Sequence, residues 1–250
     1  LLCPSMLDAK KPPLIKEPDY LEWVYELGYK YFPNNLRYLN EAALLGDEWL
    51  RSTRTPYYMM IENHLAKGGR CNAISMQAHS FIRREDEPRY ANTRYNPLVT
   101  VNQMRLYSDF RLPMQISEVT FPAYSLEAED EDIQAEILTN MYRIWFASPY
   151  MEGIVYWNFV DGYAAFAPQG TLQGENYYCG GMLRYDMTEK PILKAYKSLI
   201  DSWHTETTVT TAVFKGFYGD YDAIVTTEKG ESTHSFKLDT HYERPYDIKL

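Results

Sequence analysis

Basic charge is scarce in this chain of 250 residues, which carries 25 Lys and Arg against 34 Asp and Glu and a formal net charge of −9. This balance disfavours nucleic-acid binding, because phosphates require a basic surface. A run of about 18 apolar residues is also absent, so no membrane span is predicted. The first residues show no signal-peptide pattern, and Leu1 in place of Met fits a processed or partial chain.

Cysteine is rare, with only Cys3, Cys71 and Cys179, which lie far apart. Their odd number and wide spacing disfavour a disulfide framework and match no metal-ligand pattern, so we expect no metal site. A glycine-rich phosphate loop is missing as well, and we expect no cofactor. Tyrosine, in contrast, is abundant with 23 residues, and 5 Trp are present. Such amphipathic rings suit polyhydroxylated ligands, although ordinary packing explains most of them.

Helical periodicity alternates with short apolar strands over residues 19–203, which is typical of a parallel sheet covered by helices. The predicted strands are 36–40, 71–77, 112–121 and 153–157, and the predicted helices are 19–32, 56–67, 96–110, 127–148 and 191–203. Residues 83–94 are predicted to form a charged loop. Residues 162–181 form a second loop, of a length that is usually functional or mobile.

Polar or aromatic side chains follow the end of each predicted strand. They are Asn40, Glu41, Gln77, His79, Glu118, Trp157 and Asp161. Because parallel strands end on the same side, these residues should converge on one rim, where α/β barrels form their active sites. Glu118 is the central candidate, because a carboxylate on an apolar strand is costly to bury unless it is paired or used. A structural ion pair is the simpler alternative for Glu118, as it is for His79, and we expect the two side chains to lie together.

Five stretches occur in a recognisable order. They are 35–41 (NLRYLNE), 73–79 (AISMQAH), 114–119 (MQISEV), 153–157 (GIVYW) followed by Asp161, and 181–191 (GMLRYDMTEKP). This ordered set resembles the C-terminal half of glycoside hydrolase family ten, the endo-β-1,4-xylanase type. The resemblance implies an α/β fold of the (β/α)8 TIM-barrel class, with strands five to eight in this chain.

The resemblance also implies roles for individual residues. Glu118 matches the nucleophile of a retaining glycosidase, and His79 matches the histidine that hydrogen-bonds it. The positions that match or neighbour the sugar-lining set, and that we expect to bind substrate, are Asn40, Glu41, Gln77, Trp157 and Asp161. The implied function is retaining hydrolysis of β-1,4-xylan or a related plant polysaccharide. The alternative is a non-catalytic carbohydrate-binding protein on a degenerate or partial barrel.

Retaining chemistry requires a second carboxyl group as acid/base, and the strand count affects where it lies. The family has this Glu at the end of strand four, whereas Asn40 and Glu41 most resemble the end of strand five. The acid/base is therefore expected upstream of Leu1, and Glu41 takes this role only if the strand count is wrong. Four strands cannot close a barrel, so an N-terminal half-barrel, on a second chain or an upstream segment, is the expected partner.

The pattern changes near residue 204, which predicts a half-barrel domain at 1–204 and a small β appendage at 205–250. A hairpin of strands 221–227 and 232–238 is expected in the appendage. Packing is the simpler interpretation of its aromatic residues Phe217, Tyr218 and Tyr221, although sugar binding is an alternative.

The chain departs from the family pattern after Asp161, where residues 163–166 (YAAF) replace an expected Ser-Trp. The contacts with substrate near this loop should therefore differ from those of the family. Polymer hydrolysis implies an extracellular or periplasmic location.

Overall fold

The computed structural model describes residues 17, 19–44, 51–208 and 216–238. The chain divides into two compact units, Leu1–Tyr196 and Lys197–Leu250. Helices and strands alternate up to the last helix. In chain order they are α1 (Tyr20–Tyr31), β1 (Tyr38–Leu44), α2 (Pro56–Ala66), β2 (Ala73–Gln77), η4 (Arg84–Asp86), α3 (Glu87–Arg94), α4 (Pro97–Ser108), β3 (Met114–Val119), α5 (Ala128–Phe146), β4 (Met151–Tyr156), η5 (Gly174–Tyr178) and α6 (Pro191–Ser202).

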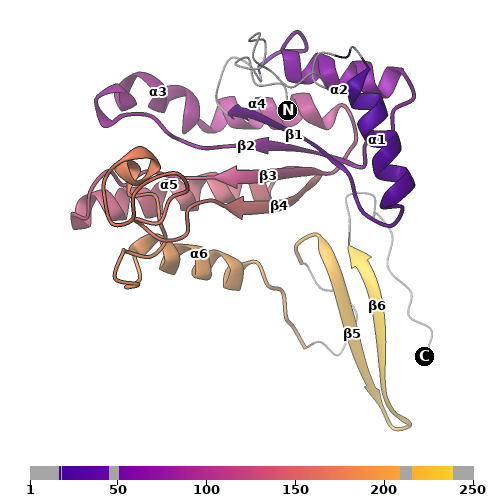
Figure 1. Ribbon diagram of the computed structural model, residues 1–250. Helices are drawn as coiled ribbons and strands as arrows, with labels where there is room; N and C mark the ends of the chain where they lie inside the picture. The colour runs from indigo at the N-terminus through magenta and orange to yellow at the C-terminus, as the bar shows by residue number, and fades with distance from the viewer. Residues whose placement is uncertain (1–16, 18, 45–50, 209–215, 239–250) are drawn as a thin grey trace. The chain divides into compact units, whose positions relative to one another are not determined.

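The strands of the first unit form one parallel sheet in the order β1-β2-β3-β4. Their arrows lie side by side and point the same way in Figure 1. Asn40 pairs with Ser75 across β1 and β2, and Gln77 pairs with Glu118 across β2 and β3. The carboxyl ends of neighbouring strands therefore share one rim, as predicted. Within the described residues the sheet does not close on itself, and β1 and β4 are its two edges.

The two faces of this sheet differ in polarity because side chains alternate along each strand. Ile74, Met76 and Ile116 occupy one face and are 0% exposed. On this face Tyr57 of α2 donates from its hydroxyl to the backbone carbonyls of Leu39 and Ser75, both at 2.8 Å, and so joins α2 to two strands. The opposite face, by contrast, carries polar side chains from β1, β2 and β3, and these side chains lie close to the rim.

The predicted loop at 83–94 is wrong, because η4 and α3 occupy this segment. Pro88 lies in the first turn of α3, where its fixed φ angle favours a helix start. The helix has almost no apolar periodicity, so the pattern that predicts the other helices does not detect it. Strand β1 also continues to Leu44 rather than ending at residue 40. No helix among the described residues is both long and apolar enough to cross a membrane.

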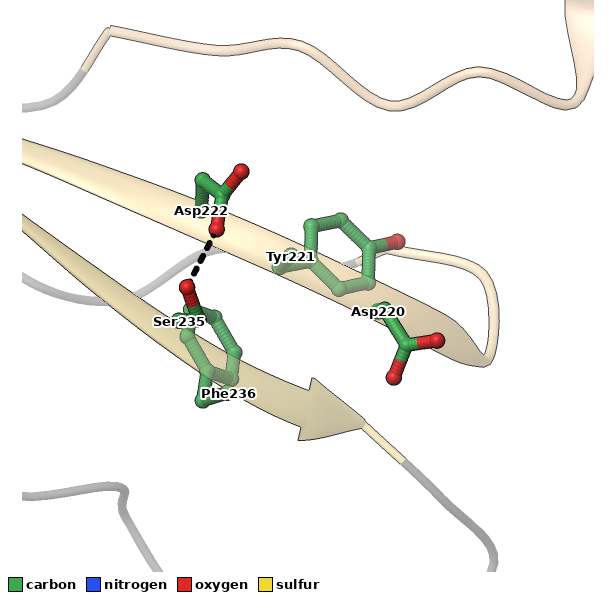
Figure 2. Close-up of a pocket in the computed structure, with 5 residues that line it drawn as sticks. All are labelled: Asp220, Tyr221, Asp222, Ser235 and Phe236. Atoms are coloured by element: carbon green, nitrogen blue, oxygen red, sulfur yellow. Dashed lines mark hydrogen bonds between the residues drawn. The ribbon is translucent and has the colours of Figure 1, made fainter. Parts of the chain in front are cut away.

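The second unit contains an antiparallel hairpin of β5 (Gly219–Thr227) and β6 (Gly230–Leu238). Tyr221 pairs with Phe236, and their rings stack with centroids 5.6 Å apart. A hollow of about 450 Å³ lies beside this pair. Figure 2 shows the side chains that line it, among them Ser235, which donates from its hydroxyl to Asp222 at 2.7 Å. Residues 209–215 and 239–250 of the predicted appendage lie outside the described residues.

Candidate active site

Glu118 lies near the carboxyl end of β3, and its carboxylate is held by Gln77 at the end of β2 and by His79 just after it. Gln77 donates from Nε2 to Oε1 of Glu118 at 3.0 Å, and Nε2 of His79 lies 3.0 Å from Oε2. The sheet register causes this arrangement, because Gln77 pairs with Glu118 and the amide of Ala78 then donates to the Glu118 carbonyl at 2.7 Å. The carboxylate remains 24% exposed, so a ligand can reach it.

His79 is fixed on every side. Its ring stacks on Phe81 at 4.5 Å and meets Trp157 edge-on at 5.9 Å, while Nδ1 lies 3.2 Å from the Thr120 hydroxyl. Burial lowers the pKa of His79, although the carboxylates of Glu118 and Glu175 oppose this shift. A neutral ring has one N–H, and the contacts favour Nε2–H donating to Glu118 while the Thr120 hydroxyl donates to Nδ1.

Arg94 of α3 supports the backbone of His79. It is 8% exposed and donates from Nη1 to the backbone carbonyl of His79 at 2.7 Å. Its positive charge also contributes to lowering the pKa of His79. Arg94 was not predicted as a site residue, because the sequence pattern assigned its segment to a loop and a lone arginine there has no distinguishing spacing.

Trp157 follows β4 and brings a second carboxylate to the site. Its indole Nε1 donates to Oε2 of Glu175 at 3.0 Å, and Asn158 donates from Nδ2 to the same oxygen at 2.6 Å. Glu175 belongs to η5 in the long loop at 162–181. The sequence marks that loop as functional by its length, but nothing in its pattern singles out Glu175.

Asn40 lies on the polar face of the sheet, next to the strand that carries Glu118. Its Oδ1 accepts hydrogen bonds from the hydroxyls of Ser75 and Ser117, both at 2.8 Å. Ser117 directly precedes Glu118, so Asn40 joins three strands immediately beside the candidate nucleophile. The structure therefore brings Asn40, Gln77, His79, Glu118 and Trp157 to one region of the rim, as the strand-end argument predicts.

Glu41 and Asp161 are placed differently from this group. Glu41 pairs in register with Met76, faces away from Asn40 and is 3% exposed. Burial of Tyr20 in α1 raises the pKa of that residue, and the charge of Glu41 adds to the rise. Glu41 therefore lies on the face of the sheet that the helices cover. These contacts do not support Glu41 as a sugar ligand or as the acid/base.

Asp161 forms a buried structural ion pair. Its Oδ2 lies 3.0 Å from Nζ of Lys190, whose side chain is 0% exposed. Its Oδ1 accepts from the Gly181 amide at 2.6 Å, and Lys190 also donates to the Cys179 carbonyl at 2.6 Å. Asp161 thus connects both ends of the 162–181 loop, and with both oxygens occupied it holds the loop rather than a sugar.

The arrangement can supply a carboxylate nucleophile whose two oxygens are oriented by an amide and a neutral imidazole. The rings of Phe81 and Trp157 contact the imidazole at 4.5 Å and 5.9 Å, and the Tyr178 ring packs against Phe81 at 5.1 Å. Rings of this kind can stack on the apolar faces of sugars. No group of three or more His, Cys, Asp or Glu side chains suited to a metal ion occurs in the part of the chain that the structure describes.

Comparison with known proteins supports the class of protein that this fold and site define, the α/β-barrel glycosidases. The model of glycosyl hydrolase family 10 matches residues 15–195, well over half of the chain. The chain therefore belongs to glycosyl hydrolase family 10. Membership implies a TIM barrel, of which the described residues form four parallel strands with their helices.

Solved structures of the family share the fold. Native xylanase 10C from Cellvibrio japonicus matches with a TM-score of 0.57 and 13% identity, over 74% of this chain and 40% of that one. A psychrophilic family 10 endo-β-1,4-xylanase matches with a TM-score of 0.53 and 11% identity, over 72% of this chain and 50% of that one. The chain therefore spans half or less of the length of these enzymes.

A curated relative bears a different kind of name. The anti-sigma-I factor RsgI6 of Acetivibrio thermocellus is 28% identical over 137 residues, which cover 52% of this chain and 16% of that protein. The similarity is confined to a small part of that much longer protein.

Proposed function

We propose that this chain is the C-terminal half of a retaining endo-glycosidase that hydrolyses β-1,4-xylan or a related plant polysaccharide. The observation that carries the proposal is the Glu118 carboxylate, held at 3.0 Å by both Gln77 and His79 at the end of a parallel strand. Membership in family 10 supports a glycoside hydrolase activity for the protein. The polymer substrate suggests an extracellular or periplasmic location.

In the proposed mechanism, Glu118 attacks the anomeric carbon of the sugar and the bond to the leaving oxygen breaks. A carboxylic acid from the N-terminal half-barrel gives its proton to that oxygen, and a glycosyl ester on Glu118 results. The same acid, now a carboxylate, takes a proton from water, and the resulting hydroxide displaces Glu118. The β configuration is retained because two inversions occur.

His79 and Gln77 contribute to both steps by orienting Glu118. Their hydrogen bonds fix the carboxylate, and a neutral His79 orients it without adding a full positive charge that would weaken its nucleophilicity. Trp157 provides a ring beside His79 on which a sugar can stack. Such preorganisation lowers the cost of reaching the transition state.

The test is Glu118→Gln in the intact protein that contains this chain, with xylan as substrate. We expect reducing-sugar release to fall by at least about 10³-fold, because the nucleophile is lost. The fold should persist, since the Gln amide keeps the size of the side chain and can still accept from Gln77. Exposed Glu136→Gln on α5 is the matched control and should keep full activity.

Unchanged activity in Glu118→Gln, with a circular dichroism melt like that of the wild type, would show that Glu118 is not the nucleophile. A wild-type protein that binds xylo-oligosaccharides but releases no sugar would instead favour the non-catalytic carbohydrate-binding alternative.

A further inference from the structure

Glu175 places a second carboxylate beside the His79–Glu118 pair, and neither the strand pattern nor the family motifs assign it a role. It is partly exposed, and its charge acts on His79 and on Tyr178. Trp157 and Asn158 both donate to its Oε2. Among the described residues no hydrogen bond involves Oε1, which can accept from a sugar hydroxyl.

The hydrogen-bond donors of Glu175 hold the carboxylate without cancelling its charge. An indole and a primary amide are both neutral, and a glutamine carbonyl would satisfy them equally well. Partial burial of a carboxylate is costly unless its charge is used. The cation Arg83, whose charge acts on Tyr178 as that of Glu175 does, has a side chain 72% exposed and lies 3.7 Å from Glu85, so its charge is shared and screened by solvent.

The space around Glu175 restricts the side from which a sugar can approach. Glu175, Asn158, Asp161 and Asn176 line a cavity of about 10 Å³, with the backbone of Gly181 at one wall. This volume holds at most a single water molecule. A sugar therefore contacts Glu175 only on its other side, where Trp157 meets His79 edge-on.

We propose that Glu175 is a specificity-determining residue that makes the part of the rim beside Trp157 select neutral sugar units and reject units that carry a carboxylate. The proposal rests on the proposed function, because it deepens the assignment of that same site. A neutral pentose offers hydroxyl donors to Oε1, whereas a uronic acid brings a third negative charge near those of Glu175 and Glu118. Two like charges several ångströms apart repel in a partly desolvated site.

The test compares two substrates in the intact protein, 4-nitrophenyl β-xylobioside and the same compound bearing a glucuronic acid substituent. The aryl group fixes the position of the sugars, and its easy departure requires little acid assistance. Glu175→Gln keeps the hydrogen-bond acceptor and removes the charge. We expect the ratio of kcat/KM for the acidic over the neutral substrate to rise roughly fivefold to tenfold.

Three controls separate charge from structure. Glu175→Asp keeps the charge and should keep most of the wild-type discrimination, and Glu136→Gln should leave the ratio unchanged. In the wild type itself, 0.5 M salt should weaken the discrimination, because screening shortens the range of the repulsion. This last measurement requires no variant, so it can still contradict the proposal if the Glu175→Gln protein folds poorly.

An unchanged ratio in Glu175→Gln, or a wild-type ratio independent of salt, would overturn the proposal. An equal loss on both substrates would make Glu175 a structural support for Trp157 only, and would overturn it too. If neither the wild type nor any variant hydrolyses either compound, the hydrolase assignment fails. The ratio of the dissociation constants of the two compounds, measured by calorimetry, then tests this inference separately. Failure to bind either compound would contradict both.

Discussion

At the scale of single residues, the site depends on which form of His79 is present. Burial lowers the pKa of His79, Arg94 adds to that effect, and Glu118 and Glu175 oppose it. The folded pKa therefore lies below the ordinary histidine value of about 6.5. Between those two values the unfolded chain binds more protons than the folded chain. The contribution of His79 to stability is thus present above about pH 6.5 and is lost as the pH falls through that window.

We predict that an NMR titration of the His79 imidazole gives a pKa below the ordinary histidine value. Glu118→Gln should lower this pKa further, because the Glu118 carboxylate stabilises the charged imidazolium and the variant lacks it. The unfolding free energy of the wild type should decrease on acidification below about pH 6.5. A His79 pKa above the ordinary value, or one that rises in Glu118→Gln, would contradict this account of the site.

The residues that sequence reasoning misplaced have a common physical cause. A strand-end rule predicts that a residue lies near the rim but not which face it occupies, and adjacent residues occupy opposite faces. Asn40 therefore reaches the polar face, whereas its neighbour Glu41 is buried on the helix side. Glu175 was missed because it lies in a loop without periodicity, where only folded geometry brings it to Trp157.

At the scale of elements, the 162–181 loop carries Glu175 and is anchored by one buried ion pair. Lys190 lies just before α6, and its ammonium contacts Asp161 and the Cys179 carbonyl. Asp161 in turn accepts from the Gly181 amide. These contacts join the two ends of the loop, so its shape depends on the ion pair of Lys190 and Asp161, whose side chains are only 0% and 8% exposed.

Lys190→Met should destabilise the protein by roughly 3–5 kcal/mol, because it leaves the Asp161 carboxylate buried without its cation. Adding Asp161→Asn should recover part of this loss, since the uncompensated charge is then removed. Urea unfolding of both variants gives the comparison. A loss below about 1 kcal/mol in Lys190→Met would mean that solvent or another group replaces the pair.

The alternation of helices and strands was predictable, whereas one helix was not. Long amphipathic helices such as α5 show their period in the sequence, and the parallel register then follows from the short buried strands. The polar helix α3 lacks such a period and supplies Arg94 to the site only through tertiary contacts. The sequence thus predicts the framework and the meeting of Gln77, His79, Glu118 and Trp157, but not Arg94 or Glu175, which also support the site.

At the scale of the whole molecule, the sheet of the described residues has two open edges, β1 and β4. Trp23, Phe32 and Leu36, in α1 and the link to β1, are 47%, 63% and 67% exposed. Open edges and exposed apolar side chains favour association with a further polypeptide. We propose that an N-terminal half-barrel covers them in the intact protein and supplies the acid/base.

Hydrogen exchange tests this proposal. The outward amides of β1 and β4 should exchange much faster in the 250-residue chain alone than in the intact protein, whereas β2 and β3 should be protected in both. The isolated chain should also self-associate in size-exclusion chromatography. An isolated chain that stays monomeric, with both edge strands as protected as the central ones, would show that no further half-barrel is needed.

The most direct test of the central assignment is covalent trapping of the nucleophile in the intact protein. A 2-fluoro xylobioside with an activated leaving group should form a stable glycosyl ester, since it requires the nucleophile but little acid assistance. Intact mass measurement should show one added disaccharide, and peptide mapping should place it on Glu118. The absence of an adduct, or an adduct on another carboxylate, would contradict the account.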